Sequence, residues 1–164
     1  MTLVVALLFL SGCGFESVYA AKAQSPLSRP DIEIGNIPDR DGQYLRNLLI
    51  DRLYINGRPP DAVYQLKLSP LANNTVNIGI QKDATATRAQ MQITTRMQLI
   101  EKSTGKVLLQ RALRAMGSYN LLDNQLATMV SQQNVTESIL HEMSGDVMTE
   151  LDLYFRRNAP QAVQ

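Results

Sequence analysis

Alternation of apolar and polar residues in the middle of the chain predicts a long, half-buried strand over residues 88–99. The odd positions of this stretch are mostly apolar and the even positions are Arg, Gln and Thr. Successive side chains of a strand point to opposite faces, so one face would be packed and the other solvated. Ser103-Thr104-Gly105 predicts a hairpin turn, after which residues 107–119 return as a second strand. Arg111 interrupts the packed side of that strand, which indicates a bulge or an edge position.

Two shorter strands are predicted nearer the N-terminus, over residues 31–37 and 63–71. In the second one, apolar and polar side chains alternate, with Lys67 on the polar side. Asn73-Asn74 is typical of a loop. Residues 76–80 either extend this strand region or lie in the connection.

Apolar residues at helical spacing predict a first helix between the two short strands. Four leucines recur three or four positions apart there and form one apolar face, and Asp39 or Asp41 is suited to cap its start. Asn56-Gly57, followed by two prolines, would end it.

The second predicted helix is much longer and runs over residues 121–157, with Asn120 as its cap. Unbroken, it would extend about 55 Å at 1.5 Å per residue, which is more than the width of a domain of this size. We therefore expect a kink near Ser131–Asn134 or at Gly145, or an end that projects.

The predicted order of elements is β-α-β-β-β-α. Each helix has one apolar stripe and each longer strand one apolar face, and these surfaces must be buried against one another. An α+β fold of two layers satisfies this requirement, with two helices packed on one face of a four-stranded, mostly antiparallel sheet. The other face of the sheet would be uncovered. We predict one such domain over residues 31–157, with Leu48, Leu49, Ile93 and Val147 in its core.

The first twelve residues predict export. Residues 3–10 are apolar without interruption, which suits a signal peptide and is far short of the roughly 20 residues of a membrane-spanning helix. Leu10-Ser11-Gly12-Cys13 follows directly and resembles the bacterial lipobox, in which small residues precede a cysteine that receives diacylglycerol. We therefore predict a signal peptide over residues 1–12 and a lipid on Cys13. The alternative is a free, buried cysteine in a first strand.

The segments on either side of the predicted domain have little to pack. Residues 13–30 hold several Ser and Pro and few large apolar groups, so they predict an extended tether that carries the lipid. Residues 158–164 predict a flexible tail. No second long apolar run follows, so the lipid on Cys13 would anchor the chain to a membrane that the chain does not span.

Composition narrows the classes of function. The net charge of +1 gives no indication of nucleic-acid binding. Cys13 is the only cysteine, which excludes an internal disulfide and a multi-cysteine metal site. His141 is the only histidine, and we expect it on the surface of the long helix. The sequence contains neither a nucleophile elbow nor a Gly-rich phosphate loop. We therefore predict that the protein is not an enzyme and that it has no cofactor apart from the covalent lipid.

Carboxylates recur every four residues on the long helix, at Glu142, Asp146 and Glu150. Such a row could bind a cation, but it is more typical of a solvated face. We predict no metal site there.

Basic residues are concentrated in the predicted hairpin. Residues 84–122 contain six of them and a single acid, Glu101. Arg88 and Arg96 lie on the solvated side of the first hairpin strand by their parity. The result would be a sheet face of Arg, Gln and Thr without acids. This face either serves solubility, or binds phosphates or the polar wall of a partner.

The turn would bring a third arginine to this face. A turn centred on Thr104 pairs Gln92 with Arg114 and Arg96 with Gln110. We therefore assign Arg114, together with Arg88 and Arg96, to the candidate contact with phosphates or with the polar wall of a partner.

Motifs spread along the chain resemble the LPS-assembly lipoprotein family LptE, in its alphaproteobacterial form. They follow one another in the order and at the spacing of the family. They are Cys13-Gly14-Phe15 with Tyr19, Gly42-Gln43-Tyr44-Leu45-Arg46-Asn47-Leu48-Leu49, Tyr64-Gln65-Leu66, Thr87-Arg88 and Gly117-Ser118-Tyr119-Asn120. The chain departs from the family at Glu16-Ser17-Val18, where a basic residue, Pro and Leu are common.

The resemblance implies a function without catalysis. Proteins of this family sit inside the lumen of the outer-membrane β-barrel LptD, help to assemble it, and with it move lipopolysaccharide to the outer leaflet. The resemblance thus implies two partners, an LptD-like barrel and lipopolysaccharide, and a lipid-anchored location at the outer membrane. Gly14, in place of Asp after the cysteine, is consistent with release to that membrane. An alternative is an auxiliary periplasmic lipoprotein subunit of a lipid-transport ABC system.

Overall fold

The computed structural model describes residues 31–55, 57–80 and 86–158. The predicted signal peptide, Cys13, the tether and all but the first residue of the tail lie outside the described residues. The elements follow in the order β1 (Ile32–Ile34), α1 (Arg40–Leu53), β2 (Tyr64–Leu68), β3 (Ala72–Ile80), β4 (Ala86–Glu101), β5 (Val107–Asn120) and α2 (Gln125–Asn158).

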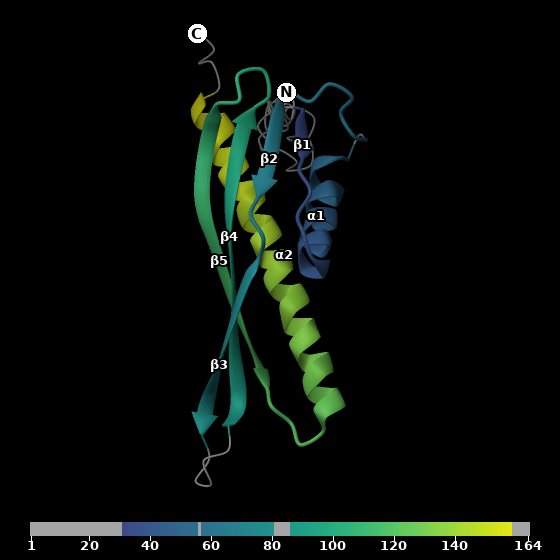
Figure 1. Ribbon diagram of the computed structural model, residues 1–164, viewed down its shortest axis with the longest axis vertical. Coiled ribbons are helices and arrows are strands. Elements are labelled where there is room, and N and C mark those ends of the chain that lie inside the picture. The colour runs from purple at the N-terminus through teal and green to yellow at the C-terminus, as the bar shows by residue number, and fades with distance from the viewer. Residues whose placement is uncertain (1–30, 56, 81–85, 159–164) are drawn as a thin grey trace, which may run out of the picture.

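The sheet is built around the 16-residue strand β4. β5 pairs with β4 along one side, and β2 and β3 pair end to end along its other side, all antiparallel. β1 adds to β2 as a parallel strand. The sheet is therefore mixed. The molecule is elongated, with α1, β1 and β2 in one half and β3 in the other (Figure 1).

Both helices lie on one face of this sheet, as predicted (Figure 1). Leu45 and Leu49 of α1 and Val147 of α2 are fully buried in one hydrophobic core together with the odd-numbered apolar side chains of β4. Of the four predicted core residues, Leu49, Ile93 and Val147 are buried and Leu48 is only partly buried at the border of the core. The α+β class of two layers is therefore confirmed.

The predicted number of strands is wrong, because the structure has five. Asn73 and Asn74 lie within β3, where they pair with Ile93 and Gln92 of β4. Side chains 72–77 of β3 are exposed on both faces, and apolar residues alternate only from Val76 onward, so no apolar pattern marks the first half of the strand. Only the backbone pairing with β4 defines that half as a strand.

The hairpin between β4 and β5 turns at Ser103-Thr104-Gly105, as predicted, and Gly105 has the positive φ of 69° that such a turn requires. The bulge lies in β5 at Leu108, which has no partner between the pairs Leu99–Leu109 and Ile100–Val107, whereas Arg111 occupies a regularly paired position of this edge strand. Of the two explanations for Arg111, the edge position is confirmed.

Helix α2 continues without a break over 34 residues, so the expected kink is absent. Its length of about 50 Å matches that of the long strands beneath it, because the molecule is elongated (Figure 1). The first turns of α2 project past the start of α1, which leaves Leu126 and Met129 exposed. The cap is Asn124 and not Asn120, since Asn124 Oδ1 accepts the N–H groups of Leu126 and Ala127 at 2.9 and 3.2 Å.

Helix α1 begins after Asp39, which has a φ of 67° and makes no side-chain cap hydrogen bond. The predicted capping by an aspartate is therefore wrong for Asp39. Gly42 instead fixes the first turn, because the helix packs directly on Ile37: a Cβ on Gly42 would lie 2.8 Å from Ile37 Cγ2. The helix ends at Leu53, just before the predicted stop signals.

We expect Gly42→Ala and Gly145→Ala to have opposite effects on stability. A Cβ on Gly145 of α2 meets only an Arg52 side-chain nitrogen at 3.9 Å, so alanine should stabilise the helix by about 0.5–1 kcal/mol. A Cβ on Gly42 clashes with Ile37, and overpacking of this kind costs about 1–3 kcal/mol. Urea denaturation of both variants measures the two changes. Equal effects in the same direction would contradict the packing of α1 on Ile37.

Candidate functional site: the uncovered face of the sheet

None of the described residues forms an element that covers the face of the sheet opposite the helices, and we call this face the outer face. It carries the even-numbered side chains of β4, since the odd-numbered ones are buried beneath the helices. Even-numbered residues 88–94 of β4 lie between residues of β5 and β3, and Gln98 lies between residues of β5 and β2, whereas Arg96 pairs only with Ala112 of β5. At the centre of this face, Gln98 of β4 donates a hydrogen bond to Gln110 of β5 at 2.9 Å.

The three arginines predicted for this face are all exposed and share its parity, but only two of them lie close together. Arg114 pairs with Thr94 and Arg96 with Ala112, so the two arginines are diagonal neighbours, a relation that ordinarily separates Cα atoms by about 7–8 Å. Arg88 lies six residues from Thr94 along β4, which is about 20 Å.

The predicted pairing of the hairpin is wrong by two residues. Gln92 pairs with Met116, and Arg96 pairs with Ala112 instead of Gln110. The bulge at Leu108 contributes to this shift. Because the error is an even number of residues, every side chain keeps its face.

A third basic side chain joins Arg96 and Arg114 from the other side of β4. Lys67 of β2 is exposed and pairs with Gln98, so it lies on the outer face beside Arg96. We call Lys67, Arg96 and Arg114 the basic cluster. Alternation in the sequence placed Lys67 on the polar side of its strand, but nothing in the sequence showed that this strand pairs with the upper half of β4.

None of the three residues of the basic cluster forms an ion pair with another residue that the structure describes. Their positive charges are therefore available to an outside ligand. Arg gives a planar set of five N–H donors that matches carboxylates and phosphates, and Lys adds a compact charge.

Other basic residues of the hairpin are already neutralised. Arg111 extends from the edge of β5 to the helix side, where its Nε lies 3.1 Å from Glu150 of α2. Lys102 Nζ lies 2.8 Å from Glu33 on β1. Neither of these charges contributes to the basic cluster.

The expectation of a sheet face without acids is wrong at one edge. Glu33 lies between the buried residues Ile32 and Ile34 and therefore points to the outer face. Its carboxylate is held by Lys102 and by Arg58, at 3.2 Å. The hydrogen bond from Lys102, followed by its charge, lowers the pKa of Glu33 below its usual value. The charge of Glu33 is thus neutralised by Lys102 and Arg58, so Glu33 does not reduce the positive charge of the basic cluster.

The remaining candidates for chemistry lie on the helix side. His141 is exposed on α2, as predicted, and its Nε2 lies 3.3 Å from the Tyr44 hydroxyl. Of the row of carboxylates, Glu150 is occupied by Arg111. Among residues 31–158, as far as they are described, no three His, Cys, Asp or Glu side chains are grouped so that they could hold a metal ion. No helix in the same part of the chain is long and apolar enough to cross a membrane.

Solved structures of several bacterial lipoproteins share this fold. A lipoprotein from Caulobacter crescentus is 21% identical, with a TM-score of 0.60 over 77% of this chain and 91% of its own. The rare lipoprotein B of Shewanella oneidensis is 10% identical, with a TM-score of 0.61 over 77% of this chain and 96% of its own. A minor lipoprotein from Acinetobacter baumannii is 18% identical, with a TM-score of 0.54 over 77% and 90%. No curated protein sequence matches the chain.

The model of the LptE lipopolysaccharide-assembly family matches residues 29–151, which cover every strand, α1 and most of α2. The match includes all residues of the basic cluster and both strands of the hairpin. The chain therefore belongs to the LptE family of lipopolysaccharide-assembly lipoproteins.

Proposed function

We propose that this protein is a lipid-anchored outer-membrane plug, which occupies and helps to assemble an LptD-type β-barrel during transport of lipopolysaccharide to the outer leaflet. Membership of the LptE family supports the general role. The observation that carries the finer proposal is the uncovered outer face of the sheet. A single domain that leaves one whole sheet face to solvent has a surface ready for a partner, and the polar side chains on this face suit a polar one.

The chemistry of the outer face fits the lumen of an outer-membrane barrel. The interior of such a barrel is polar, so a plug needs hydrogen-bonding side chains and not an apolar surface. The outer face offers amides at Gln98 and Gln110 and cations in the basic cluster. Acceptor groups on the barrel wall, or the phosphates of lipopolysaccharide, would complete the charge-assisted bonds that the fold leaves open.

The rigid support of this face is part of the proposal. Each residue of the basic cluster stands on a strand whose neighbouring side chains are buried: Leu66 and Leu68 beside Lys67, and Met97 beside Arg96. The backbone positions of the three residues are therefore fixed, so only their side-chain rotamers need to be ordered when a ligand binds.

The lipid on Cys13 is the proposed anchor of this arrangement. Cys13→Ala should leave an unprocessed precursor without an acyl chain, because the thiol that accepts the lipid is absent. Mass spectrometry of the N-terminus of protein from native membranes checks this. An unmodified cysteine at that position in the parent protein would overturn the lipoprotein assignment for this chain.

We expect loss of the basic cluster to weaken binding without unfolding the protein. Lys67→Ala/Arg96→Ala/Arg114→Ala removes three exposed charges, and exposed substitutions usually change stability by no more than about 0.5 kcal/mol each. Binding of lipopolysaccharide or of the barrel should fall by at least tenfold, and the remaining lipid binding should be less sensitive to salt. Arg88→Ala should have a smaller effect, because Arg88 stands about 20 Å away.

The matched control removes three exposed charges elsewhere, at Lys106, Arg156 and Arg157. It has the same net charge as the triple variant of the basic cluster. If the two variants bind lipopolysaccharide and the barrel equally well, the outer face serves only solubility. Affinity purification of the full-length chain from native membranes identifies the barrel in the same experiment.

A further inference from the structure

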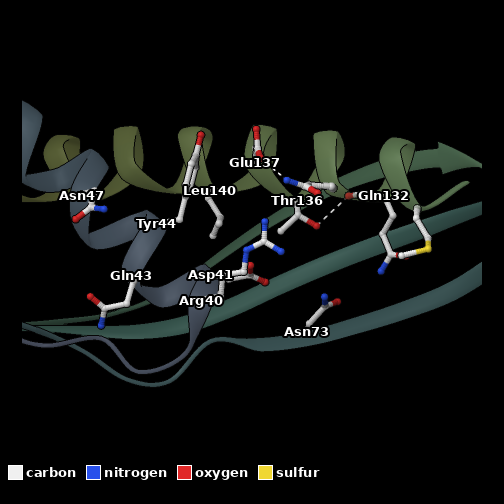
Figure 2. Close-up of a pocket in the computed structure, with 12 residues that line it drawn as sticks. Arg40, Asp41, Gln43, Tyr44, Asn47, Asn73, Gln132, Thr136, Glu137 and Leu140 are labelled. Atoms are coloured by element: carbon white, nitrogen blue, oxygen red, sulfur yellow. Dashed lines mark hydrogen bonds between the residues drawn. The ribbon is translucent and has the colours of Figure 1, made fainter. Parts of the chain in front are cut away.

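A groove lies on the helix side of the molecule, away from the basic cluster. Its walls are the first half of α1, the first half of α2 and Asn73 at the start of β3 (Figure 2). Its volume is about 480 Å³, within the range of small-molecule sites. It exists because the first turns of α2 extend past the start of α1 at Arg40, while β3 extends the sheet beneath the gap (Figure 1).

Side-chain amides line this groove to an unusual extent. α1 contributes two of them, β3 one and α2 two: Gln43, Asn47, Asn73, Gln132 and Gln133. A carboxamide carries a donor and an acceptor on one planar group, two bonds apart. It can therefore bind two neighbouring groups that each both donate and accept.

Several of these polar groups are open to a ligand. Among the described residues, the side chains of Asn47 and Gln132 have no hydrogen-bond partner. Gln43 donates to Asn36 and to the Ile37 carbonyl, which leaves its Oε1 as an acceptor. Gln133 donates to Glu137 at 3.1 Å and likewise keeps its own oxygen.

The groove also has apolar surface between these amides. Tyr44 extends from α1 toward α2, and Leu140 lies beside it (Figure 2). Met129, which is 59% exposed, also lines the groove. Polar and apolar lining thus alternate over a short distance.

The charges at the groove do not favour an ion. Arg40 is its one cation, and Asp41 and Glu137 are its two acids, so a phosphate and a metal ion would each meet charges of their own sign. An extended peptide gains affinity from the free edge of a strand, and β3 contributes only Asn73 here. A neutral ligand with adjacent hydroxyls and apolar ring faces satisfies the amides and the apolar patches together.

We propose that this groove binds the neutral pyranose units of an oligosaccharide. Vicinal hydroxyls pair with the carboxamides of Asn47 and Gln132, while a ring face packs on Tyr44 and on the exposed Met129. The site is separate from the basic cluster and does not depend on the proposed function of the outer face.

Side-chain NH₂ signals in an ¹H–¹⁵N NMR spectrum of the full chain in detergent micelles test the proposal directly. One probe is a neutral hexose oligosaccharide of the kind found in the outer part of a lipopolysaccharide core, and the other is the neutral disaccharide of N-acetylglucosamine, the uncharged sugar of peptidoglycan, each titrated to about 10 mM. We expect signals of the groove amides to move with one or both probes. The probe that moves them identifies the source of the sugar. The Gln98 and Gln110 signals, from the bonded pair on the outer face, are the internal control and should stay in place.

Asn47→Ala/Gln132→Ala should weaken binding of the effective probe about tenfold, as two hydrogen bonds are lost. Both residues are exposed on helices, where alanine is well tolerated. Asn134→Ala, an exposed amide of α2 outside the groove, is the matched control and should bind as the parent does. No movement of groove signals with either probe would overturn the proposal, as would movement confined to the outer face. Equal binding by the double variant and the control would overturn it as well.

Discussion

Burial of the odd-numbered side chains of β4 beneath the two helices is the constraint on which the rest of this structure depends. Met91, Ile93 and Met97 are exposed by 1% or less. Strand side chains alternate with a period of two, so this burial forces Arg96 and its even-numbered neighbours to the outer face. A slip of one residue in the register would bury the arginine and expose the core.

The close contact between α2 and β5 completes that constraint. Gly117 of β5 leaves no room for a Cβ, which would lie 2.6 Å from Val135 and 3.2 Å from Ile139. The helix can therefore lie directly on the strand along its length. Since α1 is only 14 residues long, it covers only part of α2, and the groove and the exposed Leu126 follow from that difference in length. One sheet thus supports two surfaces of different chemistry, a basic outer face and an amide-lined groove.

Sequence patterns predicted those parts of the fold that a local period controls. The helices, the hairpin turn at Gly105 and the parity of Arg96 and Arg114 follow from periods of 3.6 and 2. The first half of β3 was not predicted, because Asn73 and its neighbours are exposed on both faces and have no apolar pattern, whereas a strand extension over residues 76–80 is one of the two predicted alternatives.

Contacts between distant segments could not be predicted in the same way. Lys67 joins the basic cluster only through the pairing of β2 with β4, and no local pattern specifies which strands are neighbours. The shift of the hairpin register comes from a one-residue bulge, which the apolar pattern does not show. The unbroken course of α2 depends on the length of the assembled sheet on which it lies.

The central claim is that the outer face of the sheet contacts the barrel, and site-specific photocrosslinking in native membranes tests it most directly. A photoreactive residue is placed at Gln110 on the outer face, or at exposed Thr149 on α2 for comparison. Both positions are exposed, so neither substitution should disturb the core. The account predicts a crosslink from Gln110 to a large outer-membrane barrel protein. Crosslinks to such a protein from Thr149 alone, or from neither position, would contradict it.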